Sequence, residues 1–253
     1  MMFMDKRQQI CSAADLKQLG TVLFVGAHPD DETFCCGGVL AMAARNGQRV
    51  ICVTATHGEH GVHDESKWPA DQVGTIRTRE LFVALHELGI TEHYWLDYHD
   101  GECDKAPEDD AAQSIAAIIE RCSVQTIVTF GPEGLTGHPD HQSVSRWADA
   151  AVHNSTRKPR LLHVAQPREP YQKYLRPVDD ELNIFFMTQH PPLVDQDDCV
   201  VFIELDHKSL VQKYRALEAM PSQMTELLRA FPAEKFGKVF GTEALVDATD
   251  ERM

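Results

Sequence analysis

The sequence predicts an α/β fold, in which a mostly parallel sheet is covered by helices on both faces. Two observations predict it. Short apolar runs rich in β-branched residues alternate with stretches in which apolar residues recur at helical spacing. Long polar connections follow the second and third runs, at residues 56–73 and 97–110. Such alternation is typical of parallel strands joined by crossover helices, and connections of this length tend to be functional.

Four short apolar runs are the expected strands of the sheet. They are rich in β-branched and aromatic residues, as strands buried on both faces are. They cover residues 21–26, 49–55, 92–96 and 124–130. A parallel sheet built from them would carry its loops on the edge where the strands end.

A helix is expected after each of these strands. In each following stretch, apolar residues occur at i, i+3, i+4 and i+7, so that they share one helix face. The four sets are Cys36, Val39, Leu40 and Ala43; Leu81, Ala84, Leu85 and Leu88; Ile115, Ile118, Ile119 and Cys122; and Val144, Trp147, Ala148 and Ala151. Asn46-Gly47 and Gly89 follow the first two sets and are typical helix ends.

The pattern becomes less regular beyond about residue 160. We expect strands over residues 161–165, 183–187 and 200–205, and a late helix that carries Leu210, Tyr214 and Leu217. No Gly/Ser-rich linker interrupts the chain. The simplest interpretation is a single domain of residues 1–253, with a core over about 20–205 and a helical or extended segment over about 206–253.

Composition narrows the class of protein. The 253 residues include 24 Lys+Arg and 39 Asp+Glu, for a net charge of −15. Such a surface repels phosphate backbones and anionic lipids, so nucleic-acid and membrane partners are not expected. No segment has the roughly 18 apolar residues that span a bilayer, and no secretory signal is recognisable. Seven cysteines without a C-x-x-C pair indicate free thiols, so we expect a cytoplasmic protein.

Two His-Pro-Asp segments carry the strongest chemical signal. AHPDDE at residues 27–32 directly follows the first expected strand, and GHPDH at residues 137–141 follows the fourth. Both lie at the edge where open α/β sheets bind ligands. His28 and Asp31 are three residues apart across a stiff turn, so both could meet one point, whereas Asp30 would point differently.

Histidine nitrogens together with a carboxylate oxygen suit Zn²⁺, and a catalytic zinc keeps three protein ligands and one open position. The first segment could supply one His and one Asp, and the second one His. A carboxylate would remain as general base, and a histidine to stabilise an oxyanion or donate a proton. The alternative is that both segments are turns with helix-capping aspartates. Capping does not account for the histidines, so the metal site is favoured.

These motifs resemble those of the PIG-L/LmbE-like family of zinc-dependent de-N-acetylases. Recognisable motifs cover about residues 21–155, and weaker matches extend to about residue 245. The further matches are THGEHG at 56–61, Arg77 and Glu80, Asp100-Gly101, Ser222-Gln223 and the segment 240–245. The resemblance implies a Rossmann-like fold. It implies a zinc-dependent hydrolase of linear amides that removes an acetyl group from an N-acetylglucosamine-type small glycoside. A homo-oligomer is a further expectation.

The resemblance also assigns roles to individual residues. It implies one zinc ion per chain, held by His28, Asp31 and His141. It implies Asp30 as the general base and His138 as its electrostatic partner. The expected substrate contacts are Arg77, Glu59, Asp100 and Thr136. Thr136 stands where some relatives carry Tyr, and Met220 where many carry His, so the substrate side of the site departs from the family pattern.

Two other functions stay open at this point. One is an amidase that cleaves another small amide, such as a thiol conjugate, with the same residues. The other is a non-catalytic metal- or sugar-binding protein, which is disfavoured because it would not need to keep the base Asp30.

Several other residues have a purely structural interpretation as well as a functional one. The histidine-rich loop contains His57, Glu59, His60 and His63. We expect it to be a solvated loop near the substrate; a second metal site is the less favoured interpretation. Arg77 could form a surface ion pair instead of a substrate contact. Cys35 and Cys36 fall inside a helix and are expected in the core.

Overall fold

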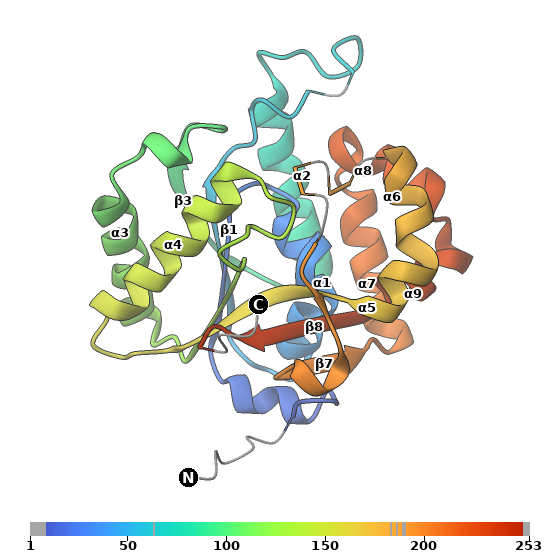
Figure 1. Ribbon diagram of the computed structural model, residues 1–253. Helices are drawn as coiled ribbons and strands as arrows, with labels where there is room; N and C mark the ends of the chain where they lie inside the picture. Colours follow the sequence, from blue (N-terminus) through green and yellow to red (C-terminus); the bar gives the residue numbers. More distant parts are fainter. Residues whose placement is uncertain (1–8, 63, 183, 186, 189–190, 250–253) are drawn as a thin grey trace.

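The computed structural model describes residues 9–62, 64–182, 184–185, 187–188 and 191–249 (Figure 1). Within them one mixed sheet has the strand order β3-β2-β1-β4-β5-β8-β7, and β6 pairs with β5. The strands are β1 (Val22–Gly26), β2 (Val50–Thr56), β3 (Glu92–Tyr98), β4 (Thr126–Thr129), β5 (Arg160–Pro167), β6 (Leu193–Val194), β7 (Val201–Glu204) and β8 (Thr242–Asp247).

Helices cover both faces of the sheet. α3 and α4 pack together on one face, and α1, α2 and α7 pack together on the other (Figure 1). The helices are α1 (Asp31–Arg45), α2 (Val73–Leu88), α3 (Glu108–Cys122), α4 (Pro139–Asn154), α5 (Arg168–Pro170), α6 (Arg176–Leu182), α7 (His207–Glu218), α8 (Pro221–Ala230) and α9 (Ala233–Phe240). Among the described residues, none of these helices combines the length and apolar character needed to cross a membrane.

The central strands follow the apolar runs of the sequence. Every residue of β1, β2 and β4 is buried, because helices pack on both faces of these strands. β1 runs parallel to both neighbours, with Val22 opposite Val50 on one side and Thr126 on the other. The α/β class, the first four strands and the four following helices are therefore confirmed, and their loops meet at one edge of the sheet.

The C-terminal third differs from expectation in two places. β5, β7 and α7 confirm two of the later strands and the late helix. The strand expected over 183–187 is wrong: its described residues Ile184, Phe185 and Met187 lie in a turn, where the Phe185 N–H donates to Asp179 Oδ1 over 3.0 Å. β8 was not expected; it lies antiparallel between β5 and β7 and makes the sheet mixed.

Helix α1 is interrupted inside its first half, at Cys36, where φ is −149° and ψ is 26°. The break frees backbone N–H groups from helical bonding. Those of Gly38 and Val39 donate to the two carboxylate oxygens of Glu243 on β8, at 2.9 and 2.6 Å. Lys213 Nζ donates to the same carboxylate over 2.7 Å, and both side chains are 2% exposed. A buried ion pair therefore fixes the first turns of α1 against the C-terminal strand.

Candidate active site

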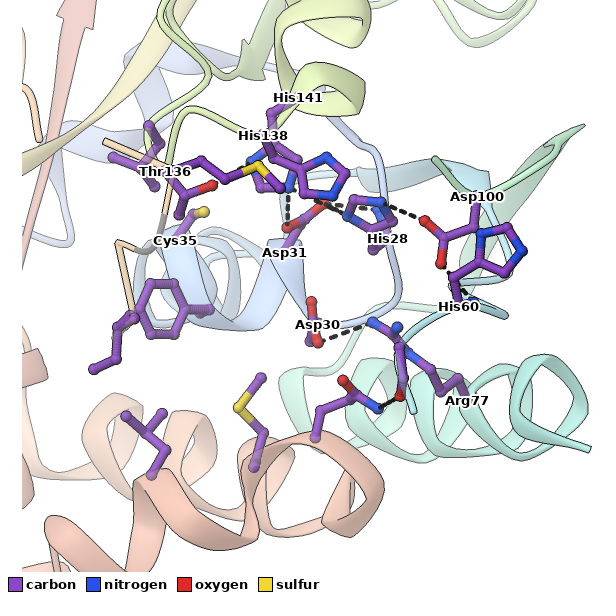
Figure 2. Close-up of a pocket in the computed structure, with 18 of the residues that line it drawn as sticks. His28, Asp30, Asp31, Cys35, His60, Arg77, Asp100, Thr136, His138 and His141 are labelled. Carbon is purple, nitrogen blue, oxygen red and sulfur yellow. Dashed lines mark hydrogen bonds and ion pairs between the residues drawn. The ribbon is translucent and has the colours of Figure 1, made fainter. Parts of the chain in front are cut away.

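Three side chains converge at the edge where β1 and β4 end (Figure 2). His28 follows β1, Asp31 begins α1, and His141 lies in the first turn of α4. His28 Nδ1 lies 3.2 Å from His141 Nε2, and Asp31 Oδ1 lies 3.4 Å from the same atom. All three residues are buried, and one donor atom from each lies within 4.8 Å of the others. The distances are short enough for the three to share one ion.

The far nitrogen of His28 is held by two carboxylates. Nε2 lies 3.0 Å from Asp100 Oδ1 and 3.2 Å from Asp140 Oδ2. Asp140 is fully buried, and it also accepts the N–H groups of Gly101 and Cys103, so its position is fixed. Carboxylate acceptors on Nε2 keep the proton there and leave Nδ1 with its lone pair directed at the other two ligands.

The other two candidate ligands are oriented in the same manner. His141 Nδ1 lies 3.0 Å from the Gly134 carbonyl oxygen, and the ring stacks on Phe130 with centroids 4.0 Å apart. This acceptor favours a proton on Nδ1, which leaves Nε2 free. Asp31 Oδ2 accepts the N–H groups of Ala27 and His28 at 2.8 and 2.7 Å, so Oδ1 remains available. Two neutral imidazoles and one carboxylate form a donor set that fits Zn²⁺.

The ionisation of the histidines follows from their surroundings. Burial alone would lower the pKa of His28, but hydrogen bonds to Asp100 and Asp140 raise it to about 10. Burial lowers the pKa of His141 to about 4. In the metal-free protein His28 therefore carries a proton that a bound metal would have to displace.

Asp30 points away from the three converging residues. Its φ of +117° lies in a region that residues with a side chain rarely adopt. This conformation turns its carboxylate into the cavity, where Oδ2 lies 3.0 Å from Arg77 Nη2. Burial raises the pKa of Asp30 to about 7, although the Arg77 charge opposes the shift. The two adjacent aspartates thus occupy different environments, as the spacing of His28 and Asp31 predicts.

His138 caps the N-terminus of α4 beside the same cavity. Its Nδ1 accepts the Asp140 N–H over 3.1 Å, which assigns the ring proton to Nε2. The ring lies edge-on to His28, with centroids 4.8 Å apart. Burial and the neighbouring His28 lower the pKa of His138. In the metal-free protein its resting form at neutral pH is thus a neutral hydrogen-bond donor.

The expected substrate contacts are distributed unevenly. Arg77, Asp100 and Thr136 line the cavity. Arg77 is 5% exposed, so it is not a surface ion pair. Glu59 does not line the cavity; its Oε1 accepts the Asp100 N–H over 3.0 Å and supports that loop.

The histidine-rich loop divides between the cavity and the outer surface. His60 lines the cavity and its N–H donates to Asp100 Oδ2 over 2.8 Å. His57 lies outside it, stacked on Trp95 and 3.0 Å from Asp97 Oδ1. His63 lies outside the described residues. The described part of the chain holds two groups of potential metal ligands, His28/Asp31/His141 and His28/His138/Asp140, and neither includes the histidines of this loop.

The cavity has a volume of about 430 Å³. Several apolar residues that the sequence did not single out also line it: Phe34, Leu135, Ile184, Met187, Met224 and Leu227. Cys36 lies in the core as expected, whereas Cys35, also expected in the core, lines the cavity. The sequence did not identify the contact of Asp140 with His28, because an aspartate after proline is equally typical of a helix N-cap.

Comparison with known proteins shows that this chain is similar to deacetylases. A family model described as GlcNAc-PI de-N-acetylase, PIG-L, matches residues 23–152. A 1D-myo-inositol 2-acetamido-2-deoxy-alpha-D-glucopyranoside deacetylase of Actinosynnema mirum is 32% identical over an alignment of 228 residues, gaps included; the match covers 81% of this chain and 81% of that one.

Solved structures share the fold at lower sequence identity. N,N'-diacetylchitobiose deacetylase from Pyrococcus horikoshii has a TM-score of 0.62 at 20% identity, covering 91% of this chain and 84% of that one. The A40926 pseudoaglycone deacetylase has a TM-score of 0.64 at 18% identity, covering 90% and 97%. At these identities the structures establish a common fold.

Proposed function

This chain belongs to the PIG-L family, and from that premise we propose a zinc-dependent N-deacetylase of an N-acetylglucosamine-type small glycoside. Its products are a free amine and acetate. The observation that carries the proposal is the convergence of His28, Asp31 and His141 beside Asp30 in one cavity. The curated relative from Actinosynnema mirum, named for an acetamido-sugar substrate, supports the same reaction.

One Zn²⁺ per chain would be held by His28 Nδ1, Asp31 Oδ1 and His141 Nε2. When bound, Zn²⁺ polarises an amide carbonyl and lowers the pKa of its bound water toward about 7. The carboxylates of Asp100 and Asp140 support this assignment, because they hold the His28 ring in the tautomer that a metal needs.

Asp30 would act as the general base. Its carboxylate takes a proton from the attacking water and returns one to the nitrogen of the leaving amine. A base is most effective when its pKa lies near the working pH, and burial has already raised that of Asp30 to about 7.

His138 would stabilise the oxyanion. Its Nε2–H donates to the carbonyl oxygen as negative charge develops there, which is where a preorganised donor contributes most. Asp100 and His60 lie on one side of the cavity, beside Arg77, and would meet the hydroxyl groups of the sugar. Thr136 lies on the other side, 3.3 Å from His141 Nδ1.

A cytoplasmic location is part of the proposal, because all seven cysteines are free and a reducing compartment keeps them so. A homo-oligomer is its expected assembly, on the family resemblance alone.

The test is an acetate-release assay of the zinc-loaded protein over a panel of N-acetylated glycosides. We expect acetate and free amine in equal amounts from at least one glucosaminide. His141→Ala should lose most of its zinc and its activity, while His153→Ala, on the exposed end of the same helix, serves as the matched control. Release of a larger acid from a thiol conjugate, without acetate release, would favour the amidase. Full zinc occupancy in His141→Ala would contradict the ligand assignment.

A further inference from the structure

The cavity has two chemically different walls. One is polar and contains His60, Arg77, Asp100 and Gln223. The other is apolar and contains Phe34, Cys35, Leu135, Met224 and Leu227. In Figure 2, Cys35 and Thr136 lie on one side, Asp100, His60 and Arg77 lie on the other, and His28, Asp30 and Asp31 lie between them.

The apolar wall is preformed. Phe34 packs edge-on against Phe240, with ring centroids 5.8 Å apart, and Phe240 packs in turn on Phe231 and Phe236. Leu135 is only 4% exposed. Because these side chains already have packing partners, the wall does not need to reorganise when a ligand enters.

Helix α8, which brings Met224 and Leu227 to this wall, is held at its N-terminus by α2. Glu80 on α2 accepts both the N–H and the hydroxyl of Ser222, and the three groups are buried. Such a bond supplies the backbone acceptor that a helix N-terminus lacks. The bond therefore fixes the start of the helix that carries Met224 and Leu227.

The position of the reacting amide decides which part of the substrate meets which wall. An amide is planar and usually trans, so its acyl chain and its nitrogen substituent extend in opposite directions from the C–N bond. The amide carbon must lie beside Asp30, between the two walls. The sugar needs hydrogen-bond partners for its hydroxyl groups and therefore occupies the polar side. The acyl group then extends along the apolar side.

We propose that the preferred substrate carries an N-acyl chain longer than acetyl, such as butanoyl or hexanoyl, which lies against Phe34, Met224 and Leu227. This inference rests on the proposed function: acetyl is still cleaved, and a longer acyl group on the same sugar nitrogen is cleaved more efficiently. The reaction is unchanged: water adds to the acyl carbon, the C–N bond breaks, and the amine nitrogen takes up the proton. An acetyl group would cover little of the wall, whereas each further methylene removes apolar surface from water.

The experiment compares two matched series of glucosamine derivatives on the zinc-loaded protein. In the first series the N-acyl chain grows from acetyl to hexanoyl on one methyl glycoside. In the second the N-acetyl group is kept and the aglycone grows from methyl to hexyl. We expect kcat/KM to rise about fourfold per methylene in the first series, corresponding to about 0.8 kcal/mol, and to stay level in the second.

A matched pair of variants on α8 locates the effect. Leu227→Ser should reduce the gain per methylene in the acyl series, while Leu228→Ser, at a neighbouring position outside the cavity lining, should retain it. A measurement on the unmodified protein does not depend on variant folding: hexanoate should inhibit at a concentration at least tenfold lower than acetate.

The possible outcomes separate this inference from the proposed function. If kcat/KM falls with acyl length while acetyl is cleaved, the acyl-chain inference is overturned and the deacetylase proposal stands. If the gain appears only in the aglycone series, the apolar wall binds the aglycone and the inference is again overturned. If no member of either series is cleaved, the proposed function fails and the inference fails with it.

Discussion

Arg77 Nη2 and Asp30 Oδ2 are 3.0 Å apart, and both side chains are largely buried. The same guanidinium donates to the carbonyl oxygens of Pro29 and Gly58, each over 2.8 Å. One arginine therefore joins the strained turn that carries Asp30 to the loop that follows β2. Its main contacts are with the protein, which favours a positioning role for Arg77.

Arg77→Met should lower kcat by roughly 100-fold, since small displacements of a reacting group cost about that much. The variant should retain zinc, because Arg77 does not contact the three candidate ligands. The measurement is kcat and KM together with zinc content. Arg77→Lys, which keeps the charge but not the three-way contact, should recover only part of the activity. An unchanged kcat with a raised KM would instead assign Arg77 to substrate binding.

Asp30 and Asp31 are neighbours with different predicted roles, and substitutions should separate them. Asp30→Asn keeps its shape but loses its basicity, so it should hold zinc normally and lose roughly 10²- to 10⁴-fold in turnover. Asp31→Ala removes a ligand, so it should lose zinc first and regain part of its activity in excess zinc. Zinc content and acetate release are measured on both variants side by side. A metal-free Asp30→Asn beside a zinc-loaded Asp31→Ala would reverse the two roles.

The stability of the metal-free protein should fall as the pH rises. His28 has a folded pKa of about 10 against an ordinary value of 6.5. The folded state thus holds a proton that the unfolded state has lost, so this contribution is complete below about pH 6.5 and disappears toward pH 10. Burial raises the pKa of Glu32 to about 8, which acts in the same direction.

The measurement is the melting temperature of chelator-treated protein at pH 6.5, 8 and 9.5. The increase in melting temperature caused by zinc should grow over the same range, because zinc binding releases the His28 proton. Asp100→Asn weakens the hydrogen bond that raises the pKa of His28, so its pH dependence should be shallower. A melting temperature that stays constant from pH 6.5 to 9.5 is incompatible with this assignment.

The buried pair of Lys213 and Glu243 should contribute to stability through charge balance. Lys213→Met leaves a buried carboxylate without its partner and should lower the free energy of unfolding by about 3–5 kcal/mol. The double variant Lys213→Met/Glu243→Gln should lose less than the sum of the two single variants, since neither charge is then stranded. Urea unfolding of all three variants tests this. Single variants within about 0.5 kcal/mol of the parent protein would show that the pair is not needed.

Much of the fold was predictable because parallel central strands are buried on both faces and appear as apolar runs. The antiparallel strand β8 was not, because its pairing with β5 and β7 depends on tertiary contacts that no local pattern records. Residues 183–187 contain an apolar run, which predicts a strand. The Phe185 N–H instead donates to the side-chain carboxylate of Asp179, and the described residues of that run lie in a turn.

The convergence of the two motifs was predictable because both follow parallel strands and therefore lie at one edge of the sheet. The choice of His28, Asp31 and His141 as the ligands came from the family resemblance. The contact of His28 with Asp140 was not predictable, because an aspartate after His-Pro is equally typical of a helix cap. The same holds for the apolar wall, whose members come from α1, the loop before α4, and α8. Each of these apolar residues looks locally like an ordinary core position.

The anchoring of α8 through Glu80 and Ser222 has an evolutionary consequence. Every residue assigned to the metal or to proton transfer lies within residues 23–152, the part that matches the family model. Met224 and Leu227 lie outside it, on a helix attached at its N-terminus. Mutations along α8 could therefore change which molecule is accepted while the hydrolytic chemistry is inherited intact. For this chain, family membership identifies the reaction, whereas the short helix α8 determines which substrate is accepted.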